Sequence, residues 1–235
     1  VDHLSNFMKV LIIVSGIFVM LSSSKYLKIN KIFKIEYPIL LLSSILGMFI
    51  MISSNDLMVF YLGLELQSLA LYVLASFKRN DQLSSESGLK YFVLSALSSG
   101  LLLYGCSLIY GFSGSTNFDQ ISNNISEVRY GLTLGIVFIL VGLAFKISAV
   151  PFHMWAPDVY QGSPTSVTIF FAILPKIAAL SVFIRFLYVP FINLIDQWQT
   201  IIIFVSIASM VFGAVAAIGQ KNLKRLMAYS SISHM

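Results

Sequence analysis

Three charged residues stand inside long apolar runs, where a charge is costly and therefore informative. Glu65 lies within YLGLELQSLALY, Lys146 within GLAFKISAV and Lys176 within ILPKIAAL. Each falls near the middle of a predicted membrane helix, so the three share one depth. A lysine in a dry environment releases its proton easily, and a nearby carboxylate restores its affinity for a proton. The pattern indicates a proton relay in which Glu65 tunes Lys146 and Lys176 receives the proton next.

Hydroxyl-bearing residues accompany these charges at helical spacing. Residues three, four and seven positions from Glu65 share its face of a helix, and serine hydroxyls hydrogen-bond across membrane helices. A polar seam is therefore predicted in an otherwise apolar bundle. Its residues are Tyr61, Ser68 and Tyr72 beside Glu65, with Ser95 and Ser99 on the following helix.

A structural interpretation of the same charges competes with the relay. Glu65 and Lys146 can form a static ion pair between helices, because buried ionisable groups also serve structural roles. Pro175 removes a backbone donor and frees the carbonyl of Phe171. In this interpretation Lys176 either binds that carbonyl or extends its side chain toward the membrane surface. The two interpretations differ in whether any of these charges moves a proton.

The sequence PFHMWAPDVY contributes a fourth candidate and three residues with simpler explanations. His153 is able to pass protons near neutral pH, although a histidine beside a helix break can equally cap backbone groups. Trp155 and Tyr160 fit the aromatic anchors found at membrane interfaces. Asp158 follows Pro157 and is typical of a loop or turn.

Composition places these residues in a membrane protein. The 235 residues are 57% hydrophobic and 11% charged, whereas soluble domains carry about 25% charged residues. A single cysteine, Cys106, excludes an internal disulfide or a thiolate metal site, and no nucleotide-binding glycine motif or haem-ligand pattern occurs. No cofactor or metal bound by the chain is therefore predicted. The net charge of +5 is assigned to membrane topology rather than to nucleic acid.

The apolar runs predict an all-α polytopic membrane protein. A spanning helix needs about 20 apolar residues, which gives about eight helices, the last beginning near residue 222. The segment 131–161 exceeds one helix, and Pro151 predicts a break near residues 148–152, a feature that marks ion pathways in transporters. Ser163 and Pro164 predict the cap and first position of the next helix. The other helices are predicted at 7–24, 38–54, 57–77, 90–111, 164–188 and 198–219.

Basic residues of the connecting segments fall mainly on one side of the membrane. Ten lie on one side and two on the other, the bias expected of a side that faces the bacterial cytoplasm or the mitochondrial matrix. The ten are Lys25, Lys28, Lys31, Lys34, Lys78, Arg79, Lys90, Lys221, Lys224 and Arg225, and the two are Arg129 and Arg185.

Three stretches of the sequence carry a resemblance to a known family. They are GLAFKISAVPFHMWAPDVYQGSPTSVTIFFAILPKIAALSVFIRF at 142–186, LGLELQSL around Glu65, and SIASMVFGAVAAIGQKNLKRLMAYSSISHM at the end. From about the second helix to the last residue, the sequence resembles the antiporter-like membrane subunits of respiratory complex I, the NADH:quinone oxidoreductase. The stretch VYQGSPT and the PK that follows it favour one type of these subunits over its larger paralogues.

The resemblance implies roles for the candidate residues and a fold. Glu65 matches the family's tuning glutamate, and Lys146 matches the proton-carrying lysine on a broken helix. Lys176 matches the central-axis lysine, and His153 a histidine near the break. The family fold contains two inverted repeats of five helices, of which this chain would hold the first and the opening of the second. The domains expected are an N-terminal helix and basic loop at 1–37, the five-helix repeat at 38–188 and a truncated second repeat at 189–235.

The resemblance also implies a proton-translocating subunit in a bacterial or mitochondrial inner membrane, assembled with other membrane-arm subunits of complex I. The complex would use NADH, FMN, iron–sulfur clusters and quinone, none of them bound by this chain. The basic residue of the second broken helix has no counterpart before Met235, so a second polypeptide is expected to supply the missing half. The alternatives are a subunit of a cation/proton antiporter or membrane-bound hydrogenase, and a purely structural membrane subunit.

Overall fold

The computed structural model describes residues 2–30, 32–124 and 130–235, and its named elements in these ranges are all helices. Basic residues Lys31 and Arg129 of the sidedness prediction lie outside the described residues. The helices are α1 (His3–Ile29), α2 (Glu36–Ser53), α3 (Leu57–Ala75), α4 (Gln82–Ser113), α5 (Phe118–Asn124), α6 (Tyr130–Ile147), α7 (Trp155–Gly162), α8 (Thr165–Tyr188), the 3-10 helix η1 (Ile192–Leu194), α9 (Ile195–Ile218) and α10 (Leu223–Ser233).

Seven helical segments of the described chain are long and apolar enough to cross a membrane. The eighth predicted helix corresponds to α10, which begins at Leu223 and has 11 residues. The helix expected at 90–111 begins earlier, at Gln82, because the Asp81 side chain accepts a hydrogen bond from the Leu83 N–H and caps it. Lys90 therefore lies inside α4 rather than in a connection.

Helices α2 and α3 cross at two glycines, and so do α4 and α6. A Cβ atom on Gly63 of α3 would lie 2.7 Å from the Met51 nitrogen of α2, and one on Gly105 of α4 would lie 2.8 Å from the Gly135 oxygen of α6. Small residues let membrane helices approach closely and gain van der Waals contact. The first crossing holds the helix of Glu65 against α2, and the second holds the helix of Lys146 against α4.

The break predicted near residues 148–152 is confirmed. Helix α6 ends at Ile147, Ser148 takes a left-handed backbone angle of φ 61°, and α7 begins only at Trp155. The predicted cap of the next helix is wrong by one position. Pro164 occupies the N-cap position of α8, while the Ser163 hydroxyl donates to the Val159 carbonyl of α7 instead.

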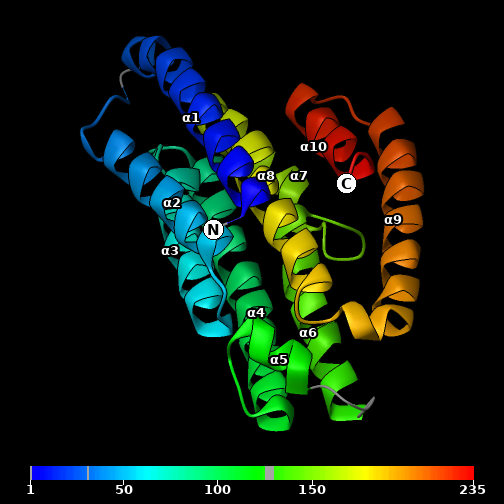
Figure 1. The fold of residues 1–235 in the computed structure, drawn as a ribbon. Coiled ribbons are helices and arrows are strands. Elements are labelled where there is room, and N and C mark those ends of the chain that lie inside the picture. Colours follow the sequence, from blue (N-terminus) through cyan, green and yellow to red (C-terminus); the bar gives the residue numbers. More distant parts are fainter. Residues whose placement is uncertain (1, 31, 125–129) are drawn as a thin grey trace.

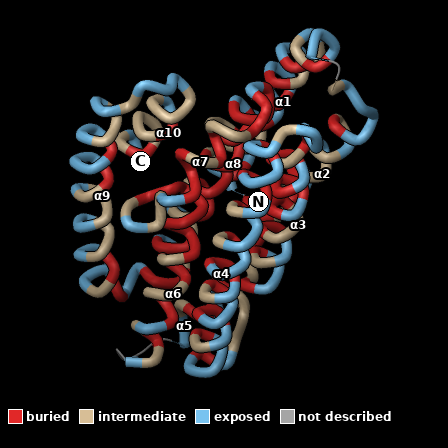
Figure 2. Tube along the Cα trace, turned by 180° about the vertical axis from the view of Figure 1, so that it is seen from behind, coloured by how far each residue is buried: buried red, intermediate tan, exposed pale blue. Residues whose placement is uncertain are grey.

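The helices form a bundle from which one helix stands apart (Figure 1). Helix α9 runs along the outside, and α10 turns back between α9 and the rest of the bundle. Most of α9 is exposed or only partly buried (Figure 2). Its buried residues are Trp198, Ser209 and Gly213.

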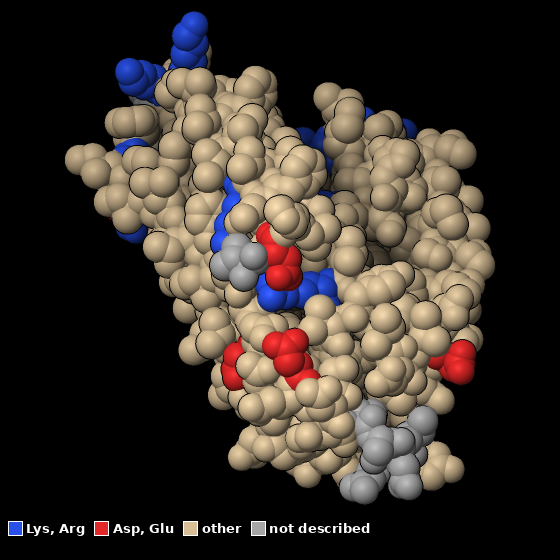
Figure 3. Space-filling view, viewed as in Figure 1, with Lys and Arg blue, Asp and Glu red and all other residues tan. Residues whose placement is uncertain are grey.

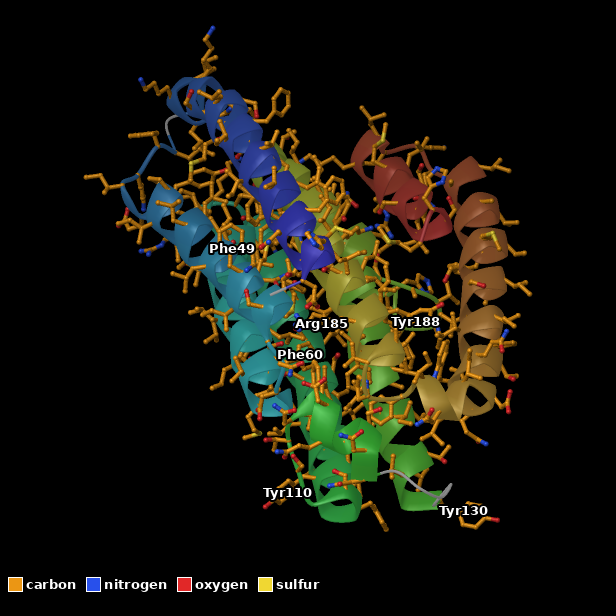
Figure 4. All side chains as sticks on the ribbon, viewed as in Figure 1. Phe49, Phe60, Tyr110, Tyr130, Arg185 and Tyr188 are labelled. Atoms are coloured by element: carbon orange, nitrogen blue, oxygen red, sulfur yellow. The ribbon has the colours of Figure 1, made fainter. Side chains whose placement is uncertain are left out.

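Lysine and arginine side chains gather at the end of the molecule where α1 ends and α10 begins, as Figure 3 shows. Arg185 lies away from this basic end, about half-way along the molecule, in the last turn of α8 (Figure 4). Its side chain is only 11% exposed and pairs with Asp2 at 3.4 Å, and its Nη1 donates to the Ile52 carbonyl at the end of α2 at 3.0 Å. The sidedness predicted for the described basic residues agrees with this arrangement.

Candidate proton-relay site

Lys146 is enclosed where α3, α4 and α6 meet. Its side chain lies in the last turn of α6 and the residue is 7% exposed. The Nζ atom donates to the Ser68 hydroxyl of α3 at 2.7 Å and to the Ser95 hydroxyl of α4 at 2.6 Å. The Tyr72 hydroxyl donates to the same Ser95 oxygen at 2.7 Å. Three members of the predicted polar seam, Ser68, Tyr72 and Ser95, thus meet at Lys146. Ser99 instead donates to the Ala96 carbonyl of its own helix.

Glu65 lies one turn before Ser68 on α3 but forms no ion pair with Lys146 in the described structure. The residue is partly buried, and its Oε1 atom is buried without a hydrogen-bond partner among the described residues. The static ion pair of the structural interpretation is thus absent from this part of the chain.

Lys176 is buried at the centre of α8 and is 3% exposed. Its Nζ atom donates to the Ser231 hydroxyl of α10 at 2.8 Å, and the Ser231 carbonyl lies at 3.4 Å. The Tyr160 ring of α7 lies 6.0 Å from the same nitrogen. Lys176 is thus held between the short helix of the break and the last helix of the chain.

Pro175 frees a carbonyl in α8, but Lys176 does not bind it. The Phe171 carbonyl accepts a hydrogen bond from the Tyr160 hydroxyl at 3.3 Å. A buried carbonyl without a partner is costly, and the tyrosine removes that cost. The carbonyl contact that the structural interpretation allowed for Lys176 is therefore not formed, and the lysine binds Ser231 instead.

Aromatic rings fill the space between the two lysine sites. Trp155 stacks on Tyr91 at 4.7 Å and on Phe145 at 5.6 Å between ring centroids. Tyr91 contacts Tyr72 at 5.1 Å on the Lys146 side, and Trp155 contacts Tyr160 at 6.4 Å on the Lys176 side. Within the described residues, the hydrogen bonds of one lysine do not connect to those of the other. We call the rings of Tyr91, Phe145 and Trp155 the aromatic partition.

The sequence predicts that Trp155 and Tyr160 are interfacial anchors, but this prediction is wrong because the two residues are only 3% and 1% exposed. Both face the bundle interior, and the Trp155 Nε1 atom donates to the Phe145 carbonyl at 2.8 Å. Tyr110 and Tyr130, which are 54% and 94% exposed, lie at one end of the molecule (Figure 4). These two tyrosines have the position and exposure of interfacial anchors.

His153 lies in the break, apart from the hydroxyls that bind the two lysines. Its ring is 4.6 Å from the Phe212 ring of α9, and its Nδ1 atom is buried without a partner among the described residues. The structure thus places Lys146 with Ser68 and Ser95 in one site and Lys176 with Ser231 in another. Glu65 lies one turn from Ser68 without a direct contact to Lys146, and His153 lies beside α9.

The sequence predicts that Asp158 is a loop or turn residue, but it belongs to α7. Its carboxylate is part of a charged network at the basic end of the molecule. Lys90 bridges Glu86 at 2.7 Å and Asp158 at 2.9 Å, and Arg225 of α10 reaches Asp158 at 3.3 Å. These side chains line a cavity of about 190 Å³. These ion pairs connect α4, α7 and α10 at the basic end of the molecule.

Ser231 and Tyr91 belong to the site but escape the sequence-based prediction. Ser231 is one of three serines in SSIS near the end of the chain, and nothing in that run separates it from its neighbours. Tyr91 follows Lys90, and its only signal is an aromatic residue at the start of an apolar run. The contacts that matter come from other helices.

Comparison with known proteins decides the family. A family model described as NADH:quinone oxidoreductase/Mrp antiporter, TM matches residues 54–235. The chain belongs to that family. The NADH:quinone oxidoreductase/Mrp antiporter family includes the antiporter-like subunits that the motifs predict, and the predicted all-α membrane fold is confirmed.

Individual relatives agree with this family. NADH-quinone oxidoreductase subunit N of Pelagibacter ubique is 77% identical over 235 residues, which cover 100% of this chain and 50% of the relative. In the structure of respiratory complex I from Thermus thermophilus, a chain 34% identical superposes with a TM-score of 0.83 over 100% of this chain and 49% of that one. This chain therefore spans about half the length of the curated relatives it matches.

The fold also extends to antiporters of the same family. A chain of the Mrp complex from Dietzia sp. DQ12-45-1b has a TM-score of 0.84 and 23% identity over 96% of this chain and 43% of that one. At that identity the likeness concerns the fold alone. It shows that the same bundle of helices occurs outside complex I.

Proposed function

We propose that this chain is part of a proton-translocating membrane subunit of NADH:quinone oxidoreductase. The observation that carries the proposal is the pair of buried lysines, each held by serine hydroxyls and neither paired with a carboxylate of the described residues at hydrogen-bonding distance. Charged side chains in the membrane interior are rare and mark proton or ion pathways. The 77% identity to a subunit N supports assigning that pathway to complex I.

In the proposed relay, Lys146 carries the proton and Glu65 controls it. The Lys146 ammonium donates to two neutral hydroxyls, so its charge is balanced mainly by the field of Glu65. A carboxylate that moves closer favours the ammonium form, and one that moves away favours release. The released proton passes the aromatic partition through hydroxyls or water and converts the neutral amine of Lys176 into an ammonium.

Cofactors and partners follow from the same proposal. NADH, FMN, iron–sulfur clusters and quinone react elsewhere in the complex, and this chain binds none of them. Other membrane-arm subunits surround the chain in a bacterial or mitochondrial inner membrane. The other half of the subunit, present in relatives of twice this length, completes the pathway, whether on this polypeptide or on a second one. His153 is assigned a secondary place beside the break.

The decisive experiment compares NADH-driven proton pumping with NADH:quinone electron transfer in sealed membranes, in the assembled complex with Lys146→Ala. General acid–base groups contribute about 10²–10⁴-fold to proton transfer, so we expect pumping through this subunit to be lost while the complex stays assembled. Glu65→Gln should impair pumping less severely, because the lysine remains. Lys25→Ala, which removes an exposed lysine at the basic end, serves as the control.

Other outcomes of this experiment favour the other functions. Normal pumping after both Lys146 and Lys176 are neutralised would contradict the relay and favour a structural subunit. Transport that depends on sodium would favour a cation/proton antiporter. This alternative is tested because a chain of the Mrp complex has the same fold.

A further inference from the structure

Helix α9 touches the rest of the described chain through a narrow inner face. Its outward residues include large apolar side chains such as Phe204, Val215 and Ile218, which are 71%, 68% and 88% exposed. In contrast, Ser209 is 0% exposed, and Gly213 is also buried, one turn later. Residues four apart share one face of a helix, so a single stripe of α9 makes the contact.

Ser209 hydrogen-bonds to the backbone of the helix break. Its hydroxyl accepts from the Val150 N–H at 2.9 Å and donates to the Val205 carbonyl of its own helix at 2.7 Å. Pro151, the next residue of the break, has no N–H to offer, and Lys146 lies four residues before Val150. A non-helical backbone at membrane depth is tolerated only where its polar groups are satisfied. Ser209 supplies that partner from another helix.

Gly213 contacts the helix that carries the partner of Lys176. A Cβ atom at Gly213 would lie 2.7 Å from the Ser233 nitrogen and 2.9 Å from its Cα atom in α10. Ser233 is two residues from Ser231, whose hydroxyl accepts from Lys176. Only a glycine allows α10 to lie this close to α9, so this position sets where Ser231 stands.

We propose that Ser209 and Gly213 form a positioning element that couples α9 to both lysine sites. Ser209 holds the break that follows Lys146, and Gly213 sets the distance of α10, and thus of Ser231, from Lys176. The proposal rests on the proposed relay for its functional meaning. A displacement of α9 changes both sites together, because the same stripe of one helix contacts both.

The first test uses Ser209→Ala in the assembled complex, with two measurements. Hydrogen–deuterium exchange of the peptide containing residues 148–154 reports the Val150 amide directly, and the ratio of pumped protons to electrons reports the relay. A buried N–H left without its partner implies an about tenfold faster exchange, with a lower proton-to-electron ratio. Ser206→Ala is the matched control, because the Ser206 hydroxyl donates to Ile203 of its own helix and its loss should leave both measurements unchanged.

A second substitution separates the hydrogen bond from side-chain volume. Ser209→Cys keeps most of the volume but offers a weak acceptor, so its exchange should lie between those of the wild type and Ser209→Ala. Exchange equal to that of the wild type in both variants would overturn the role of Ser209. Identical behaviour of Ser206→Ala and Ser209→Ala would overturn it as well.

Gly213 is tested independently with Gly213→Ala, because its methyl group must displace the backbone of α10. We expect a lower proton-to-electron ratio with unchanged exchange at 148–154. Gly219→Ala is the control, since the nearest atom to its Cβ would be 3.9 Å away. Equal ratios in these two variants would overturn the role of Gly213.

The Lys146→Ala complex distinguishes failure of this inference from failure of the relay. If Lys146→Ala abolishes pumping and Ser209→Ala does not reduce it, the relay stands and the positioning element is wrong. If Lys146→Ala pumps normally, the relay is wrong, and the exchange at Val150 alone decides whether Ser209 holds the break.

Discussion

The two lysine sites differ in what holds their hydrogen-bond partners. Ser68 and Ser95, which bind Lys146, belong to α3 and α4, and these helices pack tightly against α2 and α6 at glycine crossings. Ser231, which binds Lys176, belongs to the 11-residue α10, and α10 leans on the largely exposed α9. Within the described residues, the partners of Lys146 are therefore fixed by close helix crossings, whereas the partner of Lys176 lies on a short helix that contacts α9 at Gly213.

The difference between the two sites is consistent with two ways of controlling the lysines in the proposed relay. In the proposed relay, Lys146 has fixed hydroxyl partners and is controlled by the electric field of Glu65. In the same proposal, Lys176 is controlled by the position of Ser231 on α10, a helix that contacts α9. The aromatic partition keeps the two kinds of control separate, because it fills the space between them.

The largest effect is expected from disrupting the helix crossings that fix the Lys146 site. Gly105→Val would place a branched side chain against the Gly135 oxygen and the Ile139 nitrogen, both backbone atoms within 3.0 Å of its Cβ. Overpacking of this kind costs about 1–3 kcal/mol or more, so thermal stability and the yield of assembled complex should fall. Gly100→Val on the same helix has open space around it. Equal stability of the two variants would show that the crossing at Gly105 is not rigid.

A smaller effect is expected from Ser95→Ala, which leaves these crossings intact. It removes one of two hydroxyls that bind Lys146 and leaves the Tyr72 hydroxyl without its acceptor. Hydrogen bonds to charged groups contribute about 1.5–3 kcal/mol, so the proton-to-electron ratio should drop clearly. Ser99→Ala is the control, because that hydroxyl donates to Ala96 of its own helix. A normal proton-to-electron ratio for Ser95→Ala would show that the Ser95 hydroxyl is not required by the relay.

The smallest effect is expected from Ser231→Ala at the second site. Lys176 loses a hydroxyl but keeps the Ser231 carbonyl at 3.4 Å, and α10 can adjust its position. The ratio should fall less than in Ser95→Ala, with Ser230→Ala as the neighbouring control. A loss equal to or greater than that of Ser95→Ala would contradict the contrast between the two sites.

The sequence is sufficient for features that depend on one helix at a time. Pro151 predicts the break because a missing N–H acts locally, and the depth of Lys146 follows from counting apolar residues. It is not sufficient for contacts between helices. The spacing of Glu65, Ser68 and Tyr72 identifies a shared face but not the helix it meets. The separation of Glu65 from Lys146, the burial of Trp155 and the bond to Ser231 all depend on that packing.

The hydrogen bond from Arg185 to Ile52 joins two helices that are synthesised at different times. The Ile52 carbonyl is in the last turn of α2, where helix carbonyls have no partner in their own helix, and its donor comes 133 residues later in the chain. At a synthesis rate of about 5–20 residues per second, that donor is made roughly 7 to 27 seconds after Ile52. Until α8 has been made, the Ile52 carbonyl at the end of α2 lacks this donor.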